Sequence, residues 1–256
     1  MTQDSQATQT ARGASKVVIV TGTGSPLGAT TARHLAARGH RVVAVCSSLE
    51  AATHVHESIH SAGGTSFAFG GDVEDPTANA ELVTRTLDAY GHIDAVVHTR
   101  VGRDTGAAFA DTDDASWERL LSVSLTGTFR LVQEILPHFL SRSSGSIIAV
   151  ASGGGAGFTH AVATGATRAF IAKLAQEYAG TGIRANTVSF GPLDLSVAAV
   201  PTGLPAVGVV DSDKPVSAAP VTPLEAAQAI ELLISDGAQS ISGSTLFVDN
   251  ATVPRW

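Results

Sequence analysis

Two stretches of the chain combine residue types and spacings that could do chemistry. Residues 21–28 read Thr-Gly-Thr-Gly-Ser-Pro-Leu-Gly, between an apolar segment and a segment of helical pattern. The free N–H groups and positive dipole end of a helix start suit a pyrophosphate, and glycines let the backbone approach it closely. Residues 56–60 read His-Glu-Ser-Ile-His. This H-E-x-x-H pattern would place two imidazoles on one helix face, where they could bind zinc.

The zinc interpretation is the weaker of the two. His56 and His60 fall in the helix expected after the second strand, away from the carboxyl edge of the sheet, where α/β proteins bind ligands. No third-ligand motif follows, and Glu81 is only a distant carboxylate. The single cysteine, Cys46, excludes a multi-cysteine metal site and an intrachain disulfide. We therefore expect a solvated helix face at 56–60 and predict no metal site.

Short apolar runs alternate with amphipathic segments along the chain, which is typical of buried parallel strands and their crossover helices. We expect strands at 17–22, 41–46, 93–99, 145–152, 183–190 and 245–249, and a strand with its following turn at 65–73. We expect helices at 27–38, 49–62, 76–90, within 111–140, at 160–180 and at 222–235. This alternation predicts an α/β, Rossmann-type fold with one doubly wound parallel sheet in a single domain.

Two segments fall outside this alternation. Residues 1–15 are rich in Thr, Gln, Ser and Ala and are expected to be a disordered tail, which leaves 16–256 for the domain. Residues at about 195–222 are rich in Pro, Ala, Val, Gly and Ser. Because this is long for a structureless connection, we expect a mobile lid over a binding site.

The order of several motifs resembles the short-chain dehydrogenase/reductase family. The turn at 21–28 is similar to its T-G-x-x-x-G-x-G turn, and Asp72-Val73 looks like the pair that holds the adenine. Residues 145–152 resemble the strand that ends in the catalytic Ser, here Ser152. The stretches 182–192 and 241–251 resemble the family's G-I-R-x-N-x-V-x-P-G and closing motifs, so the resemblance covers about 16–251.

The resemblance implies the fold named above, a nicotinamide cofactor and assembly into dimers or tetramers. Carried over position by position, it assigns cofactor contacts to Thr21, Gly22, Leu27, Gly28, Ser47, Asp72, Val73 and Gly191. The second strand ends in Cys46-Ser47-Ser48, without the acidic residue that usually binds the ribose 2′-OH in NAD enzymes. This favours NADP(H) over NAD(H), with the absence of any bound nucleotide as the alternative.

The sequence departs from the family pattern around the cofactor. Pro26 replaces the middle glycine of the turn, which removes one N–H but leaves that of Leu27. The family's N-N-A-G is replaced by His98-Thr99-Arg100-Val101, in which Arg100 and Val101 would narrow the space for a ribose. Ser124 stands in the position of the catalytic Asn.

The family's Tyr-x-x-x-Lys pair is absent. The chain has two tyrosines, Tyr90 and Tyr178, and neither has a lysine four residues later. Alignment on residues 174–177 places His160 and Thr164 at the two positions, whereas the usual distance from Ser152 places Gly165 and Ala169 there. We adopt the first alignment because it keeps the helix in register. An imidazole titrates near neutral pH, so Ser152 and His160 are the predicted catalytic residues.

Composition limits the partners. Lys and Arg number 16 against 23 Asp and Glu, so the net charge is −7, which disfavours nucleic acid and anionic membranes. No apolar run is long enough to span a bilayer, and the N-terminal residues lack the apolar core of a secretory signal. We expect a cytoplasmic homodimer or homotetramer that acts on a small molecule, with an active family relative as another conceivable partner.

Three functions are compatible with these features. The first is an atypical NADP(H)-dependent oxidoreductase that acts on a carbonyl or hydroxyl group. The second is a non-redox enzyme in the same pocket, such as an isomerase, dehydratase or cyclase. The third is a catalytically silent subunit, because a fold alone does not fix a function. The retained Asp72-Val73 and Leu27 favour the first, whereas Pro26 and Arg100 favour the other two.

Overall fold

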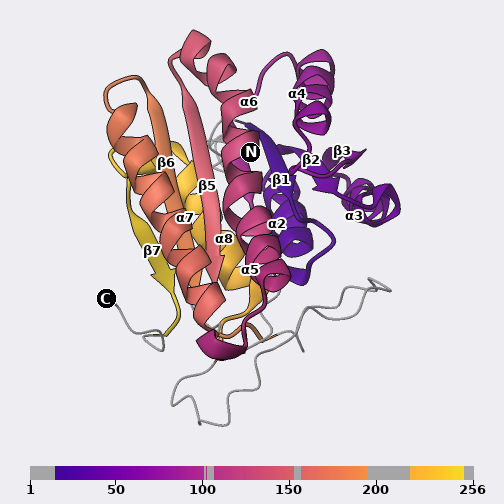
Figure 1. Ribbon diagram of the computed structural model, residues 1–256. Helices are drawn as coiled ribbons and strands as arrows, with labels where there is room; N and C mark the ends of the chain where they lie inside the picture. Colours follow the sequence, from indigo (N-terminus) through magenta and orange to yellow (C-terminus); the bar gives the residue numbers. More distant parts are fainter. Residues whose placement is uncertain (1–14, 101, 103–106, 153–156, 195–219, 251–256) are drawn as a thin grey trace, which may run out of the picture.

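Seven parallel strands form a sheet at the centre of the computed structural model, which describes residues 15–100, 102, 107–152, 157–194 and 220–250. The strand order is β3-β2-β1-β4-β5-β6-β7 (Figure 1). The strands are β1 (Val17–Thr21), β2 (Arg41–Cys46), β3 (Thr65–Gly70), β4 (Ala95–His98), β5 (Gly145–Ser152), β6 (Ile183–Phe190) and β7 (Thr245–Val248). The predicted α/β doubly wound sheet is therefore confirmed.

Helices cover both faces of this sheet. They are α2 (Pro26–Ala37), α3 (Leu49–Ser61), α4 (Pro76–Tyr90), α5 (Asp114–Leu121), α6 (Gly127–Arg142), α7 (Phe158–Glu177) and α8 (Pro223–Ile234). Apolar side chains of α2, α3 and α8 pack on one face, and those of α4, α6 and α7 pack on the other. The central strands are buried on both faces, which explains why they read as continuous apolar runs.

Local sequence signals set where the helices begin. Ser25, Ser48, Asp75 and Thr222 each cap the following helix with a side-chain oxygen. Proline opens three of these helices, where its missing N–H costs no hydrogen bond. The starts of these helices lie at the carboxyl ends of the preceding strands, which places the caps along one edge of the sheet.

The strand and turn expected over 65–73 are both present: β3 ends at Gly70, and Asp72 accepts the N–H of Glu74 in the turn that follows. The prediction for the next long helical stretch was wrong in one respect. The helical stretch expected within 111–140 is two helices, α5 and α6, joined by a π-turn at Ser122–Thr126. Hydrogen bonds of i to i+5 in this turn shift the register of the side chains between the two helices.

The predicted tail and lid fall largely outside the described residues. Of 1–15, only Ser15 is described, and its hydroxyl donates to the carbonyl of Gly39 over 2.8 Å. Of 195–222, only 220–222 are described, and Val221 pairs with Leu193 in a parallel bridge. The two flanks of this segment therefore lie side by side. Among the described residues, none of the helices is long and apolar enough to cross a membrane.

Candidate active site

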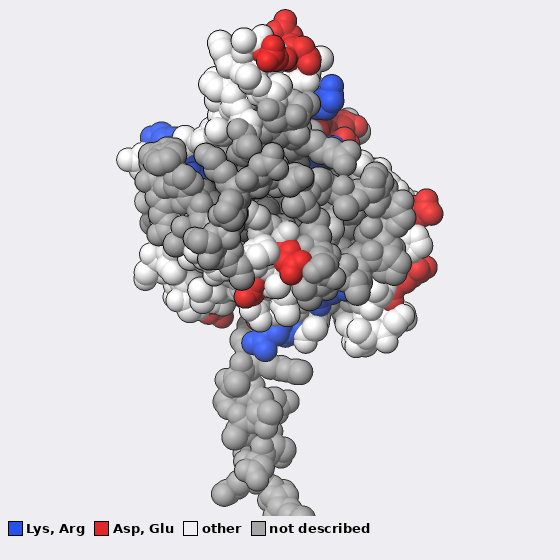
Figure 2. All heavy atoms as spheres, turned by 90° about the horizontal axis from the view of Figure 1, so that it is seen from below, with Lys and Arg blue, Asp and Glu red and all other residues white. Residues whose placement is uncertain are grey.

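The strand order reverses direction between β1 and β4. From β1 the chain continues outward to β2 and β3, and from β4 it continues in the opposite direction to β5, β6 and β7. Open α/β sheets bind ligands at such a point, outside the carboxyl ends of the strands. Figure 2 views the molecule from this edge. The segments that meet here are the β1–α2 turn and the residues after β2, β3 and β4.

The β1–α2 turn is held by a serine and two glycines. The Ser25 hydroxyl donates to the carbonyl of Gly22 over 2.9 Å and accepts the N–H of Gly28 over 3.1 Å. Gly22 has a φ of 76°, in the left-handed region that favours glycine. A Cβ on Gly28 would lie 2.2 Å from the carbonyl oxygen of Gly22. The turn therefore requires glycine at 28, as a close-packed phosphate-binding turn does.

The start of α2 offers few donors to a phosphate. Pro26 has no N–H, and the Ser25 side chain already takes the N–H of Gly28. The N–H of Leu27 is the donor that remains in this first turn, and the helix dipole adds a positive field there. A contact between this N–H and a cofactor stays a prediction.

The end of β4 is tied to the end of β1. The Thr99 hydroxyl donates to the carbonyl of Thr21 over 2.6 Å, while the Thr21 hydroxyl and Nδ1 of His98 share a hydrogen bond of 2.8 Å. Thr99 also stands 2.9 Å from where a Cβ of Gly22 would lie. The residues that replace the family's two asparagines therefore fix the glycine turn against β4, a role that the motif comparison did not assign to them.

His98 is a buried imidazole whose Nε2 has no hydrogen-bond partner in the described part of the chain. Burial lowers its pKa from 6.5 to about 4. The charge of Arg100 also lowers this pKa, whereas the backbone of Val123 and the charge of Asp72 raise it. Burial is the largest of these effects. His98 is therefore neutral at pH 7.

The side chain of Arg100 contacts the loop that follows β3. Its guanidinium donates to Oδ1 of Asp72 over 2.8 Å and lies 3.5 Å from Oε1 of Glu74. Glu74 in turn accepts a hydrogen bond from Ser122 in the π-turn. The carboxylate predicted to hold an adenine is thus ion-paired in this structure. Sequence reasoning considered only the bulk of Arg100; the opposite charges of Arg100 and Asp72 were the signal that could have indicated this pair.

The other predicted cofactor residues lie along the same edge. Ser47 is exposed after β2, and Val73 is buried after β3 with its carbonyl accepting the amide of Asn79 over 2.9 Å. Gly191 follows β6 directly, and its N–H donates to the carbonyl of Val248 over 3.3 Å. The fold therefore brings the predicted cofactor residues to one edge of the sheet, while their roles stay predictions.

Ser152 and His160 reach this edge from β5 and α7. Ser152 is the last residue of β5, opposite Phe190 of β6. His160 lies in the first turn of α7, which begins at the carboxyl edge because it follows β5. His160 and Thr164 are buried, whereas Gly165 and Ala169 are exposed. This burial supports the alignment that assigns His160 and Thr164 to the missing Tyr and Lys.

Ser124, at the position of the family's Asn, is buried in the π-turn beside this edge. Its hydroxyl accepts the N–H of Gly102 over 3.2 Å, and its carbonyl accepts the hydroxyl of Thr128 over 2.7 Å. The π-turn thus supports the chain just beyond β4.

Both tyrosines lie at the opposite, amino edge of the sheet. Tyr90 ends α4 beside Arg41, the first residue of β2, and Tyr178 caps the end of α7. Crossover helices start at the carboxyl edge and end at the amino edge, so neither phenol can reach the crevice. Arg168, one turn after Thr164, is engaged elsewhere: it donates to the Ser189 hydroxyl over 2.9 Å and stacks on Phe247.

The H-E-x-x-H motif lies on α3, as predicted. His56 Nδ1 shares a hydrogen bond of 2.9 Å with the Ser66 hydroxyl, and the His56 and His60 rings are 6.1 Å apart. Within the described residues, no group of three or more potential metal ligands is found.

Comparisons with known proteins give related sequences and structures. A family model described as enoyl-(acyl carrier protein) reductase matches residues 22–250. A cis-4-hydroxycyclohexanecarboxylate dehydrogenase of Sinomonas cyclohexanicum is 33% identical over 243 residues, which are 92% of this chain and 96% of that protein.

Solved structures show the same architecture. A 3-ketoacyl-ACP reductase from Sinorhizobium meliloti has a TM-score of 0.78 at 26% identity, covering 92% of this chain and 98% of its own. A 3-ketoacyl-(acyl-carrier-protein) reductase from Brucella melitensis, complexed with NADH, has a TM-score of 0.79 at 22% identity. The coverages are 93% of this chain and 98% of that one.

Proposed function

Because the chain belongs to the short-chain dehydrogenase/reductase family, we propose that it is an oxidoreductase that interconverts a hydroxyl and a carbonyl group of a small molecule with NADP(H). The observation that carries the proposal is the glycine turn of residues 22–28 at the point where the strand order reverses. Gly28 lies in the first turn of α2, where there is no room for a Cβ. A glycine at a helix N-terminus allows the close approach of a pyrophosphate.

Several residues of this chain would hold the cofactor. The Leu27 N–H and the start of α2 would bind the pyrophosphate, and the exposed Ser47 would face the 2′-phosphate of the adenosine without repelling it. Asp72 and Val73 would border the adenine, which requires Arg100 to leave Oδ1 of Asp72. When bound, the nicotinamide would supply the hydride for reduction of a carbonyl and accept it in oxidation of a hydroxyl.

Proton transfer would fall to Ser152 and His160. A neutral imidazole donates from one ring nitrogen and accepts at the other, so His160 could serve as the acid or the base of the reaction. Ser152, at the end of β5, would orient the carbonyl oxygen of the substrate. The buried threonine at 164 brings no positive charge to the site, so this mechanism does not use the lysine-assisted phenol of the family pattern.

The substrate class follows from the family and its relatives. The proposed substrate is a secondary alcohol or ketone, with an alicyclic hydroxy acid as a suitable first probe because a relative is named for such an activity. The segment 195–222 is proposed as a lid over the crevice. We further propose a cytoplasmic homodimer or homotetramer.

Two observations favour a second candidate. The Arg100–Asp72 ion pair occupies the place expected for an adenosine, and Pro26 removes a donor from the phosphate site. Both features suit a member of the family that binds no nucleotide, which would act as a non-redox enzyme or as a silent subunit of an active relative.

A titration with NADPH and NADH, followed by nucleotide fluorescence, separates these candidates. We expect NADPH to bind more tightly than NADH, and Arg100→Ala to tighten the binding of NADH several-fold because no ion pair has to open. Oxidation of cis-4-hydroxycyclohexanecarboxylate with NADP⁺ then tests for redox turnover. If neither NADPH nor NADH bound to the original protein or to Arg100→Ala, the oxidoreductase proposal would be contradicted.

A further inference from the structure

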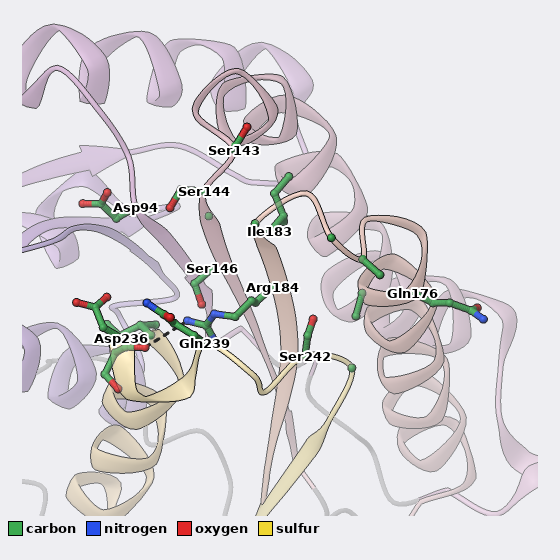
Figure 3. A pocket seen from close by; sticks show the side chains of 18 of the residues that line it. Asp94, Ser143, Ser144, Ser146, Gln176, Ile183, Arg184, Asp236, Gln239 and Ser242 are labelled. Atoms are coloured by element: carbon green, nitrogen blue, oxygen red, sulfur yellow. Dashed lines mark hydrogen bonds between the residues drawn. The ribbon is translucent and has the colours of Figure 1, made fainter.

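A cavity lies at the amino edge of the sheet, at the opposite ends of the strands from the candidate active site. It has a volume of about 760 Å³ and lies between the starts of β5 and β6, the end of α7 and the turn after α8 (Figure 3). We propose that this cavity binds the carboxylate of a small organic acid, held by Arg184 and Ser146. This proposal does not depend on the activity proposed for the crevice.

Ser146 and Arg184 are neighbours on one face of the sheet. They are register partners on β5 and β6, so their side chains lie side by side, as Figure 3 shows. Ser146 is only 3% exposed, and its hydroxyl has no hydrogen-bond partner among the described residues. A buried hydroxyl without a partner is uncommon and costs free energy, so a ligand oxygen that accepts from it would be stabilising.

Arg184 also has donors to spare. Its guanidinium donates only over long distances, 3.3 Å to the carbonyl of Ile241 and 3.5 Å to the carbonyl of Ser235. Burial lowers the pKa of Arg184, while the charge of Asp236 partly offsets this effect. In the described part of the chain, Arg184 has no carboxylate within salt-bridge distance. A half-buried cation without an ion-pair partner favours an anionic ligand.

The acidic residues of the cavity already have cationic or N–H partners. Asp236 forms an ion pair of 2.6 Å with Lys16. Asp94 accepts the N–H of Val17 over 2.8 Å and lies 3.1 Å from the guanidinium of Arg142. Since these carboxylates are neutralised by protein groups, the charge that remains for a ligand to compensate is that of Arg184.

The rest of the lining indicates an organic anion and not a bare inorganic one. Ile234 of α8 is the apolar wall on the face of the sheet that carries Ser146 and Arg184, whereas Ala172, Ala175, Ala179 and Ile183 line the cavity from the α7 face. A volume of about 760 Å³ lies within the range of small-molecule sites, about 300–1,000 Å³. A carboxylate bound to Arg184 and Ser146 would place a short aliphatic body against Ile234.

Calorimetric titration of the full chain with butyrate, acetate and inorganic phosphate at constant ionic strength tests the proposal. We expect saturable binding of butyrate, weaker binding of acetate and phosphate, and an increase in Kd of about tenfold for Ser146→Ala. Arg184→Gln should abolish binding. Arg38→Gln removes a cation from the same edge but outside the cavity, so its Kd should stay unchanged.

Thermal unfolding without ligand keeps the Ser146 test independent of folding. Because the hydroxyl has no partner, Ser146→Ala should leave Tm unchanged or raise it slightly, while butyrate binding weakens. Absence of butyrate binding, or equal binding by all variants, would overturn the proposal. Tighter binding of phosphate than of butyrate would overturn the assignment to an organic acid.

Discussion

At the scale of single residues, the buried His98 makes the stability of the fold depend on pH. It stands at the end of β4, where its Nδ1 meets the Thr21 hydroxyl, and it is only 3% exposed. Its folded-state pKa of about 4 lies below the unfolded value of 6.5. The unfolded chain therefore binds more protons between these values, and stability should fall as the pH is lowered through this window.

The first prediction concerns this pH dependence. We expect the titration of His98 to remove about 2 kcal/mol of unfolding free energy between pH 7 and pH 5. His98→Asn, which cannot be charged, should lose correspondingly less stability over the same range. Urea unfolding of both proteins at the two pH values measures the difference, and the other titrating groups cancel in the comparison. An equal loss in the two proteins would contradict a depressed pKa at His98.

The second prediction concerns the proposed acid. His160→Ala should lower kcat by about a hundredfold or more, the usual cost of losing a general acid. Ser152→Ala should cost less if the serine only orients the substrate. Steady-state kinetics with an alicyclic alcohol and NADP⁺ measure both, and circular dichroism checks that each variant is folded. Full activity of His160→Ala would exclude the acid role.

At the scale of elements, the β1–α2 turn depends on the absence of a side chain at residue 28. The third prediction is that Gly28→Ala weakens NADPH binding at least tenfold and destabilises the fold by about 1–3 kcal/mol. The added Cβ would lie 2.2 Å from the Gly22 carbonyl oxygen, and the turn must open to admit it.

Gly165→Ala is the matched control for this element. Gly165 is exposed on α7, and a Cβ there would meet no atom within 4 Å. Replacing a helical glycine by alanine should raise stability by up to about 1 kcal/mol and leave nucleotide binding unchanged. Fluorescence titration and thermal unfolding measure both variants. If both variants bound NADPH more weakly, the effect of Gly28→Ala would not be specific to the turn.

At the scale of the whole molecule, apolar side chains remain on the outer surfaces of α6 and α7. Phe129 is 45% exposed and packs edge-on against Phe170, while Phe158 is 43% exposed. Such side chains on two neighbouring helices suit an interface between copies of the chain.

The fourth prediction is that light scattering will give a mass of two or four times 26 kDa. Phe129→Asp should shift the protein toward the monomer, because burying a carboxylate in an apolar interface is costly. Leu49→Asp, at an exposed position on α3, should leave the mass unchanged. Only a 26 kDa species in the unmodified protein would rule out the homo-oligomer.

The sequence by itself determined the order of strands and helices and the edge of the sheet where the predicted cofactor residues gather. These follow from local signals: continuous apolar runs, capping residues beside prolines, and a glycine turn that follows a buried strand. The sequence also determined that a Tyr-x-x-x-Lys pair is absent. The π-turn at 122–126 was missed, because it depends on the hydrogen-bond register within the helix and not on residue types.

Only the tertiary structure decided which side chains meet across the sheet. Arg100 and Asp72 lie 28 residues apart and follow strands that are not neighbours, so their ion pair depends on how the loops fold over the edge. The same holds for His98 with Thr21 and for Ser146 beside Arg184, which adjacent strands bring together. Parallel pairing joins segments that are distant in the chain, and burial then sets their charges and hydrogen bonds.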